Sequence, residues 1–240
     1  MTGGARGVGR ATALKLAQAG CDVAILYHNS HEEADVVCGI IRKLGRRAQA
    51  IQTDVSNPEI LTESFEILRG QFDHLDFVIS NAAIGVLRPA MQLSLKHWRR
   101  CLETNALALN VLAQLAVPIM PRGGSFVAIS SIGASRAIPQ YAFIGASKAA
   151  LESLARHLAQ ELGPRGIRVN VVSAGAVDTD ALKFFPNREQ LLAEYARRTP
   201  AGPTLTPEDV ANAVFLLCQP EATMITGHTL VVDGGYCISG

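Results

Sequence analysis

The sequence lacks a charge excess, a long apolar run and a recognisable targeting segment. Its 240 residues carry 22 basic and 21 acidic side chains, so the net charge of +1 gives no indication of nucleic acid as a partner. The longest apolar stretch, residues 107–120, contains Asn110, Gln114 and Pro118 and is too short and too polar to predict a membrane span. The first residues, MTGGARG, contain no apolar signal region. We therefore expect a cytoplasmic protein with no nucleic-acid or membrane partner.

Paired cysteines and clustered histidines are lacking too. The five cysteines show no CxxC spacing, and an odd number predicts reduced thiols, most simply buried as small apolar side chains. The six histidines form no HxxH or HxxxH pair. We therefore expect no metal site and no catalytic histidine.

What the sequence does have is a regular alternation of apolar runs and amphipathic segments. Strands are predicted at 21–27, 47–55, 75–83, 124–133, 167–175 and 229–235, and helices near 10–20, 31–45, 57–71, 94–118, 141–163 and 207–218. Several strands are apolar on successive residues, as expected when both faces of a sheet are covered. This pattern predicts an α/β fold: a single Rossmann-type, doubly wound parallel sheet with helices on both faces, formed by residues 1–240 as one domain. Residues 176–206 interrupt the alternation and are expected to form a helical lid.

A glycine-rich loop, TGGARGVG at residues 2–9, stands directly before the first helix. Gly3, Gly7 and Gly9, with Val8 between the last two, would let the backbone turn tightly and bring a helix N-terminus to a pyrophosphate. The loop predicts dinucleotide binding. The strand at 21–27 ends in His28, Asn29 and Ser30 without the carboxylate that usually holds the ribose of NAD, and Arg6 in the loop is placed to face a 2′-phosphate. NADPH is therefore the expected cofactor, with a solvated Arg6 as the alternative.

Such a loop normally follows a strand, but only Met1 precedes it here. The first strand of the expected sheet is therefore apparently missing before Met1. One hypothesis is a misassigned start with the strand encoded upstream, and the other is a genuinely shortened chain. Loss of a central strand would remove two hydrogen-bonding edges and apolar cover for both helical layers.

Several motifs together resemble the short-chain dehydrogenase/reductase family over nearly the whole chain. They are TGxxxGxG at 2–9, Asp54-Val55, SNAA at 80–83, Asn105, ISS at 129–131, a helix with tyrosine and lysine, and GAVDT at 175–179. In most members a tyrosine stands four residues before the lysine, but that position is Ile144 here. Tyr141 gives the spacing Tyr-x6-Lys with Lys148 and resembles the NADPH-dependent type III enoyl-acyl-carrier-protein reductase branch. Two positions depart from that branch: Asn29 replaces a basic residue, and Ala137 replaces a second tyrosine.

The resemblance implies a set of site residues. The implied catalytic residues are Tyr141, Lys148, Ser131 and Asn105. The implied cofactor-binding residues are Gly3, Arg6, Gly7, Val8, Gly9, Asn29, Ser30, Asp54, Val55, Asn81, Ala82, Ala83, Lys148, Gly175, Val177 and Thr179. Leu182, Phe184 and Phe185 would cover an acyl chain in the lid, although core packing is an equal alternative. Lys183, Arg188, Arg197 and Arg198 would face an acidic carrier protein or a phosphate, unless they are ordinary surface charges.

The tyrosine spacing itself has a chemical meaning. On a helix, moving the phenol from residue 144 to residue 141 shifts it ~4.5 Å along the axis and turns it by roughly 60°. A carbonyl reductase protonates the oxygen on the carbon that receives hydride, whereas reduction of an enoyl thioester develops charge on an oxygen two bonds further away. The shift therefore favours an enoyl thioester reductase in which Tyr141 stabilises the enolate.

We accordingly expect NADPH-dependent reduction of trans-2-enoyl thioesters, carried by acyl carrier protein, in fatty acid or related acyl-chain synthesis. A carbonyl reductase acting on 3-oxoacyl thioesters is one alternative, and a non-catalytic cofactor-binding protein is another. The resemblance also implies a homodimer or homotetramer formed through helices 94–118 and 141–163.

Overall fold

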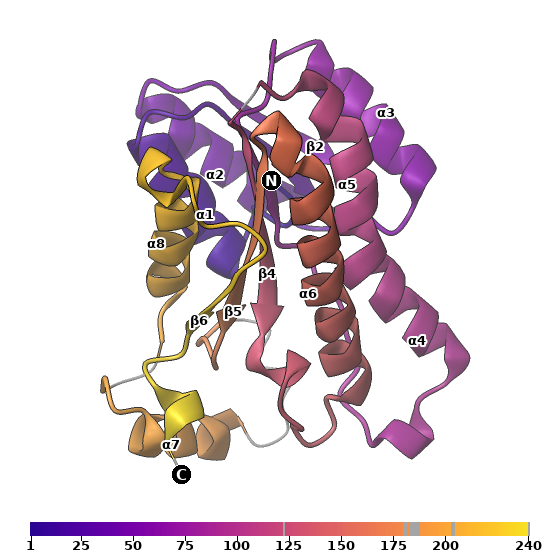
Figure 1. Cartoon of the computed structure of the whole chain (residues 1–240), viewed down its shortest axis with the longest axis vertical. Coiled ribbons are helices and arrows are strands. Elements are labelled where there is room, and N and C mark those ends of the chain that lie inside the picture. Colours follow the sequence, from indigo (N-terminus) through magenta and orange to yellow (C-terminus); the bar gives the residue numbers. More distant parts are fainter. Residues whose placement is uncertain (122, 180–181, 183–187, 203–204, 240) are drawn as a thin grey trace.

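The computed structural model describes residues 1–121, 123–179, 182, 188–202 and 205–239. Every strand lies inside one of the predicted runs, and all strand pairs are parallel: β1 (Val23–Tyr27), β2 (Ala48–Gln52), β3 (Phe77–Ser80), β4 (Ser125–Ser131), β5 (Arg168–Ala174) and β6 (Thr229–Val232). Helices flank the sheet on both sides (Figure 1). The prediction of a doubly wound α/β fold is confirmed.

The helices follow the predicted segments closely. They are α1 (Gly7–Gln18), α2 (His31–Lys43), α3 (Pro58–Arg69), α4 (Leu95–Leu102), α5 (Ala108–Ala116), α6 (Ala142–Leu162), α7 (Arg188–Arg198) and α8 (Pro207–Cys218), with short 3-10 turns η1 (Ala90–Gln92), η3 (Val117–Ile119), η4 (Ile132–Ala134), η5 (Gly163–Arg165), η7 (Pro220–Ala222) and η8 (Tyr236–Ile238). In Figure 1, α1, α2 and α8 lie on one side of the sheet, and α3, α5 and α6 lie on the other.

Two helices begin where side chains satisfy the free amides of the first turn. The Asn57 side chain accepts hydrogen bonds from the Glu59 and Ile60 amides at the start of α3. At α8, Thr206 and Asp209 form a reciprocal capping box. Proline occupies the first position of both helices, where its missing N–H costs nothing. These local signals explain why the observed boundaries match the sequence pattern so closely.

The segment predicted as one helix over 94–118 is instead broken in the middle, which corrects that prediction. A π-helical turn, η2 (Glu103–Leu107), separates α4 from α5. Its extra residue widens the helix where the buried Asn105 side chain bonds neighbouring elements. By length and composition Leu95–Ile119 could cross a membrane, with a mean hydropathy of 1.3, but here it packs against α3, α6 and β3.

The strands form two hydrogen-bonded ladders that lie side by side. β1 and β2 form a two-stranded sheet, while β3, β4, β5 and β6 form a four-stranded one. Between β1 and β3 lies the short segment Met1–Gly3. Thr2 bridges Leu26, and its amide donates to the Ile79 carbonyl at 3.0 Å. The order across the molecule is therefore β2-β1-(Met1–Gly3)-β3-β4-β5-β6.

Buried apolar side chains form a core on each face of this arrangement. Leu109 and Leu112 of α5 and Leu151 of α6 pack with Phe126 of β4 on one face. On the other face Val210 and Val214 of α8 pack with Val127 and Val172 of β4 and β5. Burial on both faces explains why β4 and β5 are apolar on successive residues.

Candidate cofactor and active site

The predicted site residues gather at the carboxyl ends of the parallel strands, where doubly wound proteins bind ligands. The glycine loop lies between the ends of β1 and β3, because Gly3 donates its amide to Leu26 and contacts Asn81 and Ala82. Ser131 ends β4, and Gly175 directly follows β5. The strand order therefore places residues that are far apart in the sequence along one edge.

The backbone conformation and close packing of the glycine loop require glycine at several positions. Gly3 and Gly7 have φ of +65° and +52°, in the left-handed region that favours glycine. A Cβ on Gly9 would lie 2.0 Å from the Gly3 carbonyl oxygen. Helix α1 begins at Gly7, so the first-turn amides and the positive end of the helix dipole are available to an anion. This cradle fits a pyrophosphate group.

The loop is tied to the end of β3 by side-chain hydrogen bonds. The Thr2 hydroxyl accepts from the amides of Asn81 and Ala82, both at 3.0 Å. The Asn81 amide group donates to the carbonyls of Thr2 and Gly3 at 3.2 and 3.0 Å. Ala83 follows as an exposed residue. Asn81 and Ala82 therefore support the loop, and their small size keeps this edge open.

The residues expected to face the adenosine half surround the ends of β1 and β2. Arg6 and Asn29 are exposed, and Ser30 is partly buried at the start of α2. His28 Nε2 lies 3.7 Å from Asp54 Oδ2. Partial burial opposes ionisation of Asp54, but hydrogen bonds from Ser56 outweigh it and hold the pKa of that carboxyl below its usual value.

Val8 lies in the first turn of α1, and Val55 is buried beside Asp54. Arg6 is the basic residue of the glycine loop, residues 2–9.

The segment after β5 approaches the loop from the opposite side. A Cβ on Gly7 would lie 3.3 Å from the Thr179 methyl group, so Thr179 borders the anion cradle. Val177 is buried and bridges Leu205. Gly175 packs against Asp233 and the ring of Tyr195, and a Cβ at this position would lie 3.0 Å from the Asp233 Cβ, a tight contact.

Tyr141 lies at the N-terminal boundary of α6, directly beside the turn that follows β4. A Cβ on Gly133 would lie 2.6 Å from the Tyr141 ring, so the ring packs against that backbone. The Tyr141 hydroxyl is hydrogen-bonded to Ser131. Burial raises the pKa of Tyr141 while the Ser131 bond counteracts it, so the phenol stays protonated at neutral pH.

Lys148 is buried two turns further along α6. It is 5% exposed, and its Nζ donates to the Ile129 carbonyl of β4 at 2.7 Å. Burial lowers the pKa of Lys148 to about 8, and the Glu152 carboxylate raises it in part. Glu152 also accepts a hydrogen bond from Ser130 at 2.6 Å. Tyr141 and Lys148 therefore both face the carboxyl end of β4.

Ser131 and Ile144 complete the surroundings of the phenol. The Ser131 hydroxyl also accepts the Gly133 amide at 3.2 Å, so it is held by the η4 turn. A Cβ on Gly85 would lie 2.2 Å from the Ile144 side chain. Ile144 thus lies directly against the loop after β3, at the position where the more common spacing has tyrosine.

Asn105 bonds the loop after β3 to helix α6. Its amide nitrogen donates to the Ile84 carbonyl and to the Ser147 hydroxyl, both at 2.9 Å, and its oxygen accepts the Ile84 amide at 2.8 Å. The carbonyl that Asn105 holds belongs to Ile84, and Ser147, the neighbour of Lys148, receives the second bond.

The segment that we expected to form a lid contains helix α7, which packs against the C-terminal turn η8. The rings of Tyr195 and Tyr236 stack with centroids 3.8 Å apart, and Arg198 lies over the Tyr236 ring. Leu182 is buried. Phe184, Phe185 and Lys183, also expected in the lid, lie outside the described residues. Arg188 pairs with Asp178 and Arg197 with Glu194, which reduces their free charge for a partner.

Sequence reasoning missed four residues that support the site. Thr2 and Ser147 were not singled out, although both carry hydroxyls beside predicted site residues. Glu152 had a usable signal, since it stands four residues after Lys148 and therefore on the same helical face. Gly85 had no such signal. Glycine is required there because Ile144, which is remote in sequence, packs directly against it.

Within the residues that the structure describes, no three His, Cys, Asp or Glu side chains are grouped as a metal site would require. All five cysteines are free thiols. Three of them, Cys38, Cys101 and Cys218, are buried.

Comparison with known proteins agrees with this geometry. Residues 3–237 match a family model described as enoyl-(acyl carrier protein) reductase. The chain is 38% identical to a 1-cyclohexenylcarbonyl-CoA reductase from Streptomyces collinus, over 99% of this chain and 86% of that protein. It also resembles a short-chain dehydrogenase from Burkholderia cenocepacia J2315 in complex with NADP, with TM-score 0.92, 36% identity and 99% and 96% of the two chains covered.

A blue fluorescent protein from a metagenomic library, in complex with NADPH, is similar to the same extent. Its TM-score is 0.91 at 33% identity, with 98% of this chain and 96% of that chain covered. Together with the glycine loop and the β4–α6 pair of Tyr141 and Lys148, these matches show that the chain belongs to the short-chain dehydrogenase/reductase family of oxidoreductases.

Proposed function

We propose that the protein is an NADPH-dependent reductase of the 2,3 double bond of trans-2-enoyl thioesters. The observation that carries the proposal is the position of the buried hydroxyl. Tyr141, and not residue 144, presents a phenol to Ser131 at the end of β4, while Ile144 fills the other position against Gly85. The Streptomyces relative, named as a reductase of an enoyl-CoA, supports the same reaction class.

The residues around the glycine loop fit a dinucleotide, and different residues would bind different parts of it. Gly3, Gly7 and the first turn of α1 would hold the pyrophosphate, with Thr179 at its side. Arg6 would face the 2′-phosphate, since no carboxylate follows β1. When bound, the nicotinamide supplies the hydride. Two similar structures hold NADP or NADPH, which supports this choice of cofactor.

Tyr141 acts on the oxygen of the thioester. Because its pKa is raised, the phenol donates a hydrogen bond at neutral pH and stabilises the negative charge that develops as the double bond is reduced. Ser131 orients the phenol by its direct hydrogen bond. In this role the tyrosine is an oxyanion donor, and delivery of the final proton to the α-carbon is a separate step.

Lys148 contributes a buried positive charge to the same region. With its pKa at about 8, the ammonium is largely protonated at pH 7 and loses its proton as the pH rises through 8. The charge favours the developing anion, and the remaining donor hydrogens would bind the ribose hydroxyls. The reaction rate should therefore fall on the alkaline side of pH 8.

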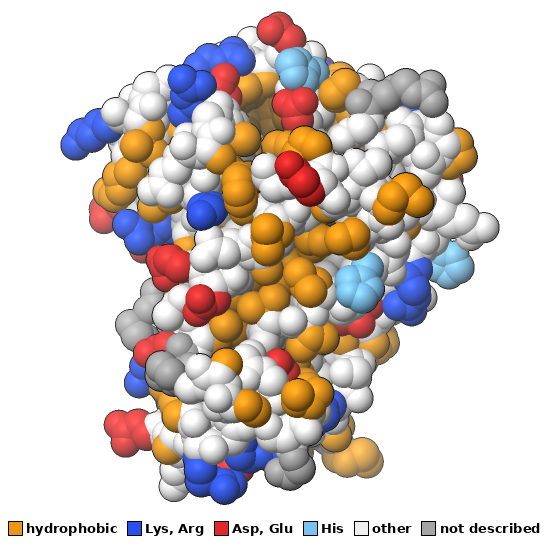
Figure 2. All heavy atoms as spheres, turned by 60° about the vertical axis from the view of Figure 1, so that its left-hand side comes forward, with side chains coloured by type: hydrophobic (Ala, Val, Ile, Leu, Met, Phe, Trp, Pro, Cys, Tyr) orange, Lys and Arg blue, Asp and Glu red, His pale blue; other side chains and the backbone are white. Residues whose placement is uncertain are grey.

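The carrier of the acyl chain is the finer part of the proposal. We propose acyl carrier protein as the partner and fatty acid or related acyl-chain synthesis as the setting, although the relative from Streptomyces is named for a CoA thioester. We further propose a homodimer or homotetramer. Figure 2 shows hydrophobic side chains along one face of the molecule, and Leu216 of α8 and Val231 of the edge strand β6 are 62% and 50% exposed.

The decisive experiment compares substrates at fixed enzyme concentration. NADPH oxidation is measured with crotonyl and acetoacetyl thioesters, each linked to CoA and to acyl carrier protein, and repeated with NADH. We expect turnover of the crotonyl thioesters with NADPH. Faster turnover of acetoacetyl thioesters would replace the proposal by a carbonyl reductase, and NADPH binding without either reaction would indicate a non-catalytic protein.

A further inference from the structure

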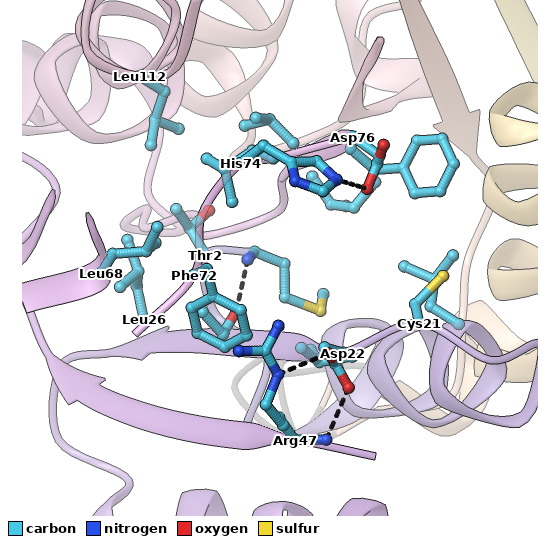
Figure 3. Close-up of a pocket in the computed structure, with 18 of the residues that line it drawn as sticks. Thr2, Cys21, Asp22, Leu26, Arg47, Leu68, Phe72, His74, Asp76 and Leu112 are labelled. Atoms are coloured by element: carbon cyan, nitrogen blue, oxygen red, sulfur yellow. Dashed lines mark hydrogen bonds and ion pairs between the residues drawn. The ribbon is translucent and has the colours of Figure 1, made fainter. Parts of the chain in front are cut away.

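The support of Tyr141 differs from that of the glycine loop. A cavity of about 370 Å³ lies between β1 and β3, beside Met1 and Thr2, and Figure 3 shows side chains that line it. Tyr141 and residues 138–140 lie outside this cavity, in the short connection between η4 and α6. The position of the phenol therefore depends on the backbone of that connection.

Tyr141 stands just outside helix α6. It directly precedes Ala142, the first helical residue, and its φ of −110° and ψ of 9° depart from helical values. The period of the helix fixes the direction of Lys148, but it does not by itself fix the direction of a residue outside the helix. The position of the phenol relative to Lys148 is therefore set by the chain that leads into α6.

Residues 138–141 form a β-turn of a kind that usually contains glycine. The Tyr141 amide donates to the Ile138 carbonyl at 3.2 Å and closes the turn. Pro139, at the second position, has its φ held near about −65° by its ring. Gln140, at the third position, has a φ of +62°. A negative φ followed by a positive one is the type II pattern, in which glycine or asparagine is usual at the third position.

Gln140 carries the backbone strain of this turn. Among the described residues other than glycine, it alone has a positive φ. Such a conformation is unfavourable for a residue with a Cβ and persists only where the surrounding structure holds it. The Gln140 side chain is exposed, so its packing does not compensate the strain. The Gln140 carbonyl, in contrast, accepts the Arg88 amide at 3.1 Å, from the loop that follows β3.

We propose that Gln140 is a positioning residue: its left-handed backbone sets where the Tyr141 phenol stands and joins it to the loop after β3. The inference rests on the function proposed above for Tyr141. The same loop already packs against the first turn of α6, because Gly85 lies directly against Ile144. The hydrogen bond from Arg88 attaches the loop one turn earlier, beside the phenol. The strained turn thus holds Tyr141 between the loop and the end of β4.

Three substitutions at residue 140 separate the backbone conformation from the side chain. Gln140→Gly and Gln140→Asn accept a positive φ readily, whereas the β-branched residue of Gln140→Val disfavours it strongly. With crotonyl-CoA and NADPH, we expect kcat to stay close to its original value in the first two variants. In Gln140→Val it should fall by about tenfold or more, because the phenol is displaced. KM and the NADPH Kd should change less than kcat. Ala142→Val, at the exposed helical position after Tyr141, is the matched control and should retain kcat.

A second pair of variants acts on the other partner of the hydrogen bond. Arg88→Pro removes the amide that donates to Gln140, whereas Arg88→Ala keeps that amide and removes only an exposed side chain. Loss of the bond should lower kcat by about fivefold in Arg88→Pro. Arg88→Ala should leave kcat unchanged. Melting temperatures show whether each variant folds, and the Arg88 pair decides the matter if Gln140→Val does not fold.

A measurement without turnover separates this inference from the proposed function. In protein labelled with 13C at the tyrosine Cζ, the Tyr141 signal, assigned with Tyr141→Phe, reports the hydrogen bond of the phenol to Ser131. The signal should move in Gln140→Val and stay in place in Gln140→Gly. If the unaltered protein reduces no crotonyl thioester, the proposed function fails, but this comparison still tests the position of the phenol.

Two results would overturn the inference. An equal loss of kcat in Gln140→Gly and Gln140→Val would assign the effect to the side chain of residue 140. An unchanged Tyr141 signal or an unchanged kcat in a folded Gln140→Val variant would show that the left-handed backbone does not position the phenol.

Discussion

Two junctions between neighbouring strands meet the site, and they are built very differently. β4 and β5 are paired over seven residues each, from Ser125 with Arg168 to Ser131 with Ala174. Within the described residues, Met1–Gly3 hydrogen-bonds to both β1 and β3 and joins them. The first junction carries the residues proposed for chemistry, and the second carries the glycine loop. The difference shows that the proposed catalytic groups rest on a continuous ladder, whereas the cofactor loop depends on three residues.

The largest expected effect concerns the weaker junction, for the chain beginning at Met1. Burial lowers the pKa of the Met1 amine from 8.0 to about 5, so between these values the unfolded chain binds a proton that the folded chain does not. Stability should therefore rise with pH from 5 to 8 and fall by as much as ~4 kcal/mol when the pH is lowered from 8 to 5. Urea unfolding at both pH values measures this change.

N-terminal acetylation provides the matched control for this prediction. An acetylated chain has no amine to titrate, whereas its carboxylates and histidines are unchanged. The difference in unfolding free energy between the free and acetylated chains should itself depend on pH. A constant difference from pH 5 to 8 would show that the amine is hydrated in the cavity.

The stronger junction is tested by Tyr141→Phe. Removing the hydroxyl should lower kcat by about a hundredfold, or ~3 kcal/mol, because an oxyanion donor is lost while the ring still packs against Gly133. The NADPH Kd should change little. Tyr236→Phe, in the C-terminal turn, is the control and should retain turnover. Near-normal kcat in Tyr141→Phe would remove the phenol from the mechanism.

Thr2→Val tests how much the hydrogen bonds of Thr2 stabilise the glycine loop. The substitution keeps the shape but leaves the Asn81 and Ala82 amides without their acceptor, at a cost of ~2 kcal/mol in unfolding free energy. The NADPH Kd should weaken as well, since the loop loses its tie to β3. Thr2→Ser retains the hydroxyl and should restore most of both quantities. Equal loss in the two variants would assign the effect to packing.

The smallest expected effect comes from Glu152→Gln beside the stronger junction. Glu152 raises the pKa of Lys148, so its neutralisation should lower that pKa below about 8 and move the alkaline limb of the rate profile to lower pH. For a decrease of about one pKa unit, the expected loss is about fivefold in rate near pH 8, or ~1 kcal/mol. Glu161→Gln, an exposed carboxylate near the end of α6, should leave the profile in place. An unshifted limb in Glu152→Gln would mean that Lys148 does not set it.

The sequence predicted well those elements that have local signals. It predicted poorly those features that depend on contacts between residues far apart in the sequence. β4 and β5 were predicted from continuous apolar runs, and α3 and α8 from amphipathic segments whose starts prove to be capped by Asn57 and Thr206. The π-helical turn was not predictable, because its geometry follows from bonds of Asn105 to Ile84 and Ser147. These partners are remote in sequence and leave no periodic pattern.

The same division holds for the candidate site. Tyr141, Lys148 and Ser131 stand in one short segment with a fixed spacing, and the structure brings all three to the end of β4. The sequence did not predict the cavity between β1 and β3. That cavity depends on side chains from α1, α3 and α5 that only the fold brings together.

The contact between Ile144 and Gly85 links two positions that are 59 residues apart, counted as 144 minus 85. Any side chain at 85 would collide with a branched one at 144, so the two positions should covary: glycine with a bulky aliphatic residue, or a larger residue at 85 when 144 is small. A chain that regained a phenol at 144 would need its loop after β3 to accommodate a planar ring. Switching between the two tyrosine spacings would then require coordinated change in two segments rather than one substitution.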